Sequence, residues 1–212
     1  MIFERELAEK LGSSLPEGWT KSCLTGIADY LNGLAMQKFR PSEEEIGLPV
    51  MKIAELRQGK CGNDCERCSP NIKQEYIIHD GDVIFSWSGS LLVDIWCGGV
   101  CGLNQHLFKV TSKTHKKWFY YCWTNHYLNQ FIEMAADKAT TMGHIKREAL
   151  DNADVLIPDK DTYNRLERIL QPMADTMIQN RIENRILADY RDSILPKLMS
   201  GEIDVSAVSL SR

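Results

Sequence analysis

Residues 159–195 read DKDTYNRLERILQPMADTMIQNRIENRILADYRDSIL. The stretch has no glycine and is rich in Arg, Glu, Leu, Ile and Met, a composition that favours a helix. Apolar or amide side chains recur every seven residues, with a second series four residues behind the first. The predicted pairing face consists of Leu166, Leu170, Met173, Met177, Asn180, Leu187 and Ile194. This spacing predicts a coiled-coil helix over residues 159–200.

Three further residues and one alternative refine this prediction. Pro172 should kink the helix or mark its true start, and Pro196 with Gly201 should end it. The alternative is a plain amphipathic surface helix. We favour the coiled coil because the helix follows a self-contained domain and has no other core to lie on. Asn180, at a core-like position, would then help to fix the register.

Upstream of Pro158 the sequence changes to short β-type segments. Strands are expected at residues 76–78, 83–85, 91–96, 103–110 and 155–157, with a turn at residues 79–82 between the first two. Helices are expected at residues 118–136, near 145–150 and, before a Pro- and Gly-containing break, at 3–11. The predicted fold class is α+β. The expected organisation is an extension at 1–14, a domain at 15–158, the helix at 159–200 and a tail at 201–212.

Composition excludes several classes of protein. With 212 residues, 43% hydrophobic and 25% charged, the chain does not resemble a wholly disordered or low-complexity one. Its net charge of −4 differs from that of proteins that hold nucleic acid by bulk charge. No apolar run approaches the ~20 residues of a membrane span, and the start of the chain does not resemble a signal peptide. These features predict a cytoplasmic protein.

A cluster of thiols is the most prominent local motif. Cys61, Cys65 and Cys68 lie within eight residues, and Cys97, Cys101 or His79 can supply a fourth ligand to a zinc ion. The same spacing matches the iron–sulphur motif of radical S-adenosylmethionine enzymes, but those enzymes use a barrel that this chain does not predict. The favoured interpretation is a solvent loop with free thiols and no required cofactor. A structural zinc, or a zinc or iron–sulphur enzyme, is the alternative.

Three short basic segments combine cations with hydroxyl donors, which is what phosphate and base-edge contacts require. The alternative for each segment is a simple solvated loop. Together they favour DNA, and the candidate contacts are Lys38, Arg40, Lys113, Lys116, Lys117, Lys138, Thr140, Thr141, His144, Lys146 and Arg147.

Motifs for catalysis are missing from the sequence. There is no His-Glu-x-x-His pair, no P-loop, no Gly-x-Ser-x-Gly elbow and no Asn/Asp-Pro-Pro-aromatic segment of an amino-methyltransferase. Ser86 to Ser90 resembles a nucleophile elbow only superficially. None of these catalytic motifs therefore supplies a candidate active site.

In combination, these segments resemble the specificity subunits of type I restriction–modification systems, and in particular one half of such a subunit. Residues 15–19 (LPEGW) look like the beginning of a target recognition domain, and residues 81–86 (GDVIFS) and 104–108 (NQHLF) look like its central strands. Residues 139–145 through 157–158 look like its closing segment. The most specific match is RDSILPKLMSGEI at residues 191–203, which is similar to the C-terminal end of the helical conserved region.

The resemblance implies a non-catalytic subunit of a type I deoxyribonuclease and adenine-N6 methyltransferase complex. The domain would read one half of an interrupted DNA site, and the helix would serve as a ruler towards the other half. Expected partners are double-stranded DNA, modification subunits, the restriction subunit through the complex, and a second copy of this chain or a different half. A protein that competes for the modification subunit without reading DNA is a further alternative.

Overall fold

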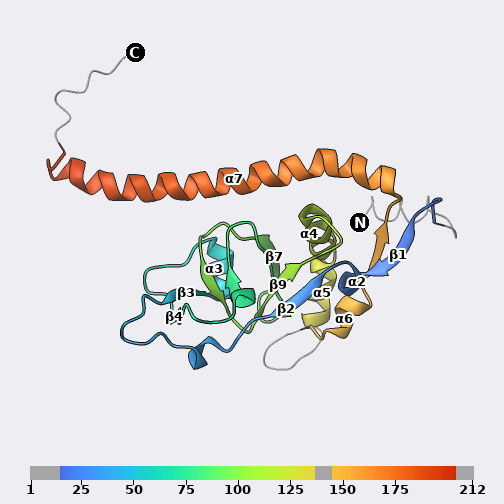
Figure 1. The fold of residues 1–212 in the computed structure, drawn as a ribbon, viewed down its shortest axis with the longest axis horizontal. Helices are drawn as coiled ribbons and strands as arrows, with labels where there is room; N and C mark the ends of the chain where they lie inside the picture. The colour runs from blue at the N-terminus through green and yellow to red at the C-terminus, as the bar shows by residue number, and fades with distance from the viewer. Residues whose placement is uncertain (1–14, 137–144, 204–212) are drawn as a thin grey trace, which may run out of the picture.

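The computed structural model describes residues 15–136 and 145–203. The predicted helix at residues 3–11 and the predicted DNA contacts Lys138, Thr140, Thr141 and His144 lie outside the described residues. Short strands and helices up to Ile157 are followed by one long helix, which confirms the predicted α+β fold class (Figure 1).

Four antiparallel strands form the central sheet in the order β2-β9-β6-β7. Their bounds are Asp29–Asn32 for β2, Leu107–Thr111 for β9, Val83–Ser86 for β6 and Leu92–Ile95 for β7. Successive side chains of a strand alternate between faces. Phe85 accordingly joins the main core, and its neighbour Ile84 joins a second, smaller one. Both faces of β6 are therefore covered.

Two helices cover the main-core face of this sheet. α4 spans Lys117–His126 and α5 spans Leu128–Ala136, so the single helix predicted at residues 118–136 is wrong in one respect: the chain turns at Tyr127. Phe131 of α5 packs on Phe85 with ring centroids 5.9 Å apart. The turn at Tyr127 lets both helices present aromatic side chains to the same core.

A second sheet has the strand order β4-β3-β8-β5. Its strands span Arg67–Cys68, Leu48–Met51, Cys101–Leu103 and Ile77–Ile78, respectively. The short helices of this half of the domain are η1 (Met36–Lys38), α3 (Ile53–Gln58) and η2 (Gln74–Tyr76).

The structure differs from two of the predictions about strands. The strand predicted at residues 103–110 is two strands, β8 and β9, because the chain passes from one sheet to the other between them. The strands on either side of the predicted turn at 79–82 do form, but β5 pairs with β8 and β6 pairs with β7 and β9. Sequence spacing predicted the strands and missed their partners.

A two-stranded sheet closes the domain beside the start of the long helix. β1 (Thr20–Cys23) pairs antiparallel with β10 (Asp154–Ile157), with α2 (Leu24–Ile27) and α6 (Glu148–Asp151) next to them. The register places Thr20 opposite Ile157. The beginning and the end of the domain thus lie side by side.

The long helix α7 spans Lys160–Met199. The Asp159 carboxylate caps its N-terminus by accepting the backbone N–H groups of Asp161 and Thr162, each at 3.0 Å. The helix passes through Pro172, so Pro172 does not mark its start. Its 40 residues give a length of about 60 Å. None of the helices in the described ranges is apolar enough over a sufficient length to cross a membrane.

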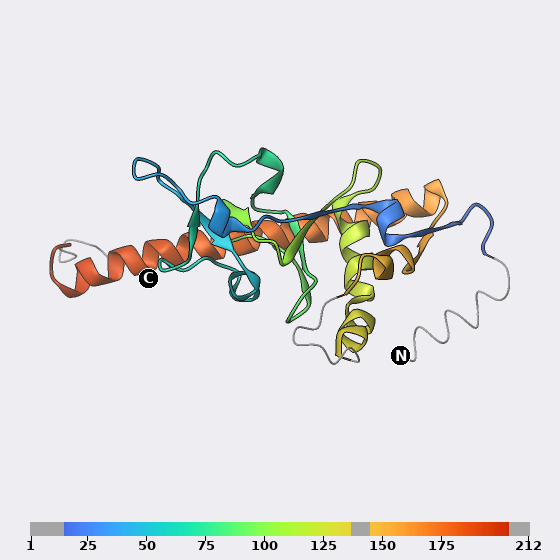
Figure 2. The same ribbon diagram turned by 90° about the horizontal axis from the view of Figure 1, so that it is seen from below.

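α7 runs along one side of the domain, and its apolar contacts with the main core lie in its first half (Figures 1 and 2). The side chains of this helix that pack against the main core are Tyr163, Leu166, Leu170, Ala174, Met177 and Ile178. The expectation that the helix has no core to lie on is therefore wrong. Beyond Ala188 every side chain up to Ile203 is exposed.

Candidate nucleic-acid interface

Polar side chains gather at one end of the central sheet. Asn32 ends β2 and Ser86 ends β6, while Leu107 begins β9; the register places Ser86 opposite Leu107 and Asn32 opposite Phe108. The loops that follow or precede these strand ends carry further polar side chains. We call this set the polar edge, and it consists of Asn32, Trp87, Ser88, Gln105 and His106.

A network of hydrogen bonds holds the polar edge. The Trp87 indole N–H donates to Asn32 Oδ1 at 3.0 Å, and the Trp87 ring lies 5.6 Å from that of Phe108. Ser88 Oγ is 3.0 Å from His106 Nδ1, and Gln105 Nε2 is 3.4 Å from His106 Nε2. These contacts fix the directions in which the amide and hydroxyl groups point.

The Ser88–His106 pair forms part of this network. The Gln105 amide nitrogen faces His106 Nε2 and the Ser88 hydroxyl faces Nδ1, and the tautomer decides which ring nitrogen donates. The two contacts hold the imidazole between the two polar runs of the polar edge.

Two of the predicted cations lie beside the polar edge. The backbone N–H of Ile145 donates to the Trp87 carbonyl at 3.2 Å, and Lys146 and Arg147 follow directly, both exposed. They precede α6, which lies on the side of the domain away from α7 (Figure 1). Donors, acceptors and positive charge are thus combined on a surface that α7 does not cover, as contacts to base edges and phosphates require.

Comparison with known proteins decides the family. Residues 16–188, well over half of the chain, match the family model described as Type I restriction modification DNA specificity domain. The chain belongs to this family. The chain is 23% identical over 211 residues to the MjaIX specificity subunit of Methanocaldococcus jannaschii, covering 93% of this chain and 47% of that protein. It is 22% identical over 197 residues to the EcoBI specificity subunit of Escherichia coli, covering 90% and 40%.

Solved structures show the same fold. The HsdS subunit from Thermoanaerobacter tengcongensis matches with a TM-score of 0.52 at 20% identity, over 95% of this chain and 50% of that one. The S subunit from M. genitalium matches with a TM-score of 0.53 at 16% identity, over 86% and 46%. The chain spans about half the length, or somewhat less, of the relatives that it matches.

The DNA contacts predicted for this specificity domain fall on different sides of it. Lys113, Lys116 and Lys117 follow β9 and lie at the opposite end of the central sheet from the polar edge, next to α7. Lys116 Nζ is 3.4 Å from Glu167 Oε1 of that helix. Lys38 and Arg40 are exposed in and after η1. The predicted DNA-contact residues that the structure describes therefore do not form one surface. Their role in binding DNA stays a prediction.

None of the five residues of the polar edge is among the DNA contacts predicted from the sequence. For all but Asn32 the signal was present as two short polar runs: residues 86–90 follow the strand predicted at 83–85, and residues 104–106 begin the strand predicted at 103–110. Because the two runs are about 15 residues apart, only the β6–β9 pairing shows that they meet.

The thiols of this family member are divided between two cores. Cys61 packs on the cluster that contains Cys101, whereas Cys68 belongs to the cluster around Val50. A hydrogen bond from the Cys101 thiol lowers the pKa of Cys61, while that bond and burial raise the pKa of Cys101. In residues 15–136 and 145–203, no group of three or more His, Cys, Asp or Glu side chains is arranged to hold a metal ion.

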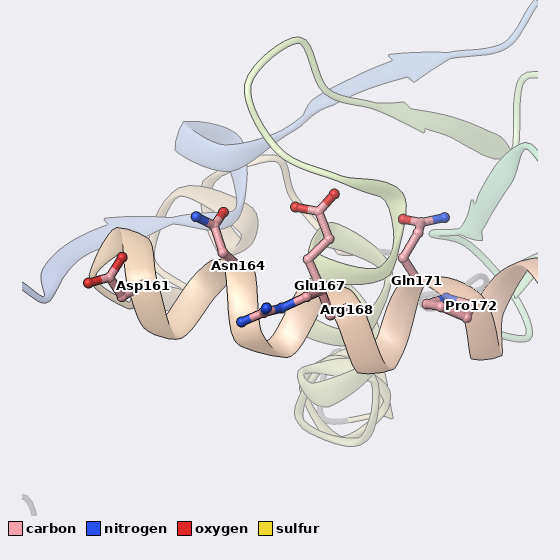
Figure 3. Close-up of a pocket in the computed structure, with 6 residues that line it drawn as sticks. All are labelled: Asp161, Asn164, Glu167, Arg168, Gln171 and Pro172. Carbon is pink, nitrogen blue, oxygen red and sulfur yellow. The ribbon is translucent and has the colours of Figure 1, made fainter.

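One surface pocket lies on α7 (Figure 3). Its lining consists of Asp161, Asn164, Glu167, Arg168, Gln171 and Pro172. All six come from one helix and include no serine, cysteine or histidine.

The predicted pairing face of α7 is split. Leu166, Leu170 and Met177 turn towards the domain and pack on its core. The remaining predicted residues, Met173, Asn180, Leu187 and Ile194, are exposed, with Met173 at 63% and Leu187 at 55%. Pairing stays a prediction for these four, because the other three already have contacts within the chain.

Proposed function

We propose that this chain is a non-catalytic subunit that reads one half of an interrupted DNA site for a type I restriction–modification complex. The observation that carries the proposal is the polar edge of a type I specificity domain, flanked by Lys146 and Arg147. Amide side chains such as Asn32 and Gln105 are suited to adenine, because they can donate and accept at once. Lys146 and Arg147 would bind phosphates and set the domain's position.

Pairing through α7 would join two half-sites. The exposed side chains Met173, Asn180, Leu187 and Ile194 keep the seven-residue spacing on a helix of about 60 Å. A symmetric pair of this chain would read an interrupted palindrome, since a two-fold protein matches two-fold DNA. Pairing with a different half would give a site without that symmetry.

The other partners follow from the assembly proposed. Modification subunits would methylate adenine at the site, and the restriction subunit would join through the complex. These subunits would also supply positive charge around the DNA, which fits a chain whose net charge is −4. The chain would need no metal or cofactor of its own and would act in the cytoplasm with the DNA.

A methylation map tests the proposal. The chain is expressed with the modification subunit of its own operon, and the DNA is sequenced for N6-methyladenine. The expected result is an interrupted motif that disappears when the chain is omitted. Arg147→Ala should weaken methylation at every site, while Lys160→Ala, which removes an exposed cation outside the predicted DNA contacts, serves as the matched control.

The form of the motif distinguishes the partners. A palindromic motif indicates two copies of this chain, and a non-palindromic one indicates a second, different half. A stable complex with the modification subunit but no methylated motif would overturn the reading of DNA and favour a protein that only competes for that subunit.

A further inference from the structure

Two arginines attach α7 to the domain beyond its last apolar contact. Arg181 and Arg185 lie one helical turn apart, after Ile178, on the inward side of the helix. Arg181 Nη1 donates to Asp94 Oδ1 at 2.7 Å and to the Ile95 carbonyl at 3.1 Å. The second attachment point of the helix is therefore polar.

Arg185 makes the more specific of the two contacts. Its Nη1 and Nη2 atoms donate to the two oxygens of Asp80, each at 2.8 Å, and Nη1 also donates to the Cys97 carbonyl. Asp80 additionally accepts the Gly99 N–H at 2.8 Å. Such a bidentate contact fixes the orientation of the guanidinium and the carboxylate as well as their distance. The side chains of Arg185 and Asp80 are 27% and 26% exposed, so solvent screens this ion pair only in part.

Two glycines form the turns opposite these arginines. Gly81 and Gly99 have positive φ values of 87° and 89°, which favour glycine. A β-carbon at Gly99 would be in ordinary contact with Arg185 Nη1 at 3.5 Å, and one at Gly81 would lie 3.0 Å from Lys117 Nζ and 3.9 Å from Ile178. The turn after β5 and the turn before β8 thus hold the acceptors where the helix passes.

The apolar contacts and the arginine contacts together fix the direction of α7 relative to the domain. The apolar contacts begin at Tyr163 and the polar ones end at Arg185, a span of about 33 Å along the helix. Beyond Arg185 the helix continues to Met199, a further length of about 21 Å. Without the arginine contacts the helix would pivot at Ile178, its last apolar contact, and a swing of roughly 10° there would move Met199 by about 5 Å, more than the ~3.4 Å step between base pairs.

We propose that Arg181 and Arg185 are positioning residues that set how many base pairs separate the two half-sites, because they fix the angle of the recognition domain on the helix. This inference rests on the proposed function. It assigns spacing to a contact within one chain, in addition to the pairing between chains.

The test uses the same methylation map with variants of the polar contact. Arg185→Ala and Asp80→Asn should leave the bases read in each half unchanged. Methylation at sites whose spacer is one base pair longer or shorter should rise about tenfold relative to the normal spacer, as expected for the loss of one charge-assisted contact. Arg185→Lys keeps the charge but loses the bidentate geometry. Its methylation at sites with a longer or shorter spacer should therefore lie between that of the unaltered chain and that of Arg185→Ala.

The matched control is Arg191→Ala. Arg191 lies on the same helix and pairs with its neighbour Asp192, where both side chains are 67% exposed. The Arg191→Ala variant should methylate sites with the normal spacer only. An unchanged spacer in Arg185→Ala, Asp80→Asn and Arg185→Lys would overturn the inference while leaving the proposed function intact. If Arg185→Ala fails to fold, the two milder variants decide. The absence of any motif with the unaltered chain would overturn both proposals.

Discussion

Leu170 and Leu187 lie on the same helix in opposite environments. Leu170 packs on the core of the domain, while Leu187 is 55% exposed. Both belong to the seven-residue pattern of the sequence. The helix therefore has a face that belongs to the domain and a face that remains available to a partner.

This difference predicts separate effects of the same substitution. Leu187→Asp should abolish pairing with little change in the stability of the domain, since exposed substitutions cost within about 0.5 kcal/mol. Leu170→Asp should destabilise the domain by about 2 kcal/mol or more, a drop in Tm of roughly 4–8 °C. Analytical ultracentrifugation and thermal unfolding measure the two effects. An unchanged mass for Leu187→Asp would contradict the pairing face.

The polar edge predicts two kinds of DNA-binding defect. Gln105→Ala should relax the choice of base at one position of the half-site, at a cost of about 1–3 kcal/mol for the preferred base. Arg147→Ala should weaken binding to all sequences and reduce the salt dependence of the affinity by about one phosphate contact. Binding is measured with the assembled complex over a range of salt. Equal effects from Lys160→Ala, an exposed cation outside the predicted contacts, would contradict the assignment.

A buried hydrogen bond links β2 to α4 and should contribute measurably to the free energy of unfolding. The Tyr30 hydroxyl lies 2.7 Å from Thr124 Oγ1, and Thr124 donates to the Tyr120 carbonyl. Burial raises the pKa of Tyr30, so this hydroxyl stays protonated and donates. Tyr30→Phe should cost about 1 kcal/mol, and Thr124→Val more, because it leaves the Tyr30 hydroxyl unpaired. Urea unfolding of both variants tests this order; a neutral Tyr30→Phe would contradict it.

The thiols should differ in their rate of alkylation. Cys61 is half-buried with a lowered pKa, whereas Cys101 is buried and its pKa is raised. Since the thiolate is the reactive form, iodoacetamide at pH 8 should modify Cys61 well before Cys101. Peptide mass spectrometry of the folded chain gives the order. Protection of Cys61, Cys65 and Cys68 by one equivalent of zinc would instead support the metal alternative.

Local pattern was enough to predict where the helix lies. The absence of glycine and the seven-residue spacing at residues 159–195 are features of neighbouring positions, and helices depend on those. The same holds for β6 and β7, whose apolar residues lie between turn-forming ones. Strand partners were not accessible in this way: β5 and β6 are adjacent in sequence and pair in different sheets.

The sequence by itself indicated the long C-terminal helix and the family, because both depend on short-range spacing and on motifs. Only the tertiary structure decided that Leu170 faces the domain and Leu187 faces solvent, and that Asn32 meets Trp87 across 55 residues. It also decided that Arg185 reaches Asp80 across 105 residues. The physical reason is that such contacts depend on strand register and on the rotation of a helix about its axis. Both are set by packing over the whole domain and not by neighbouring residues.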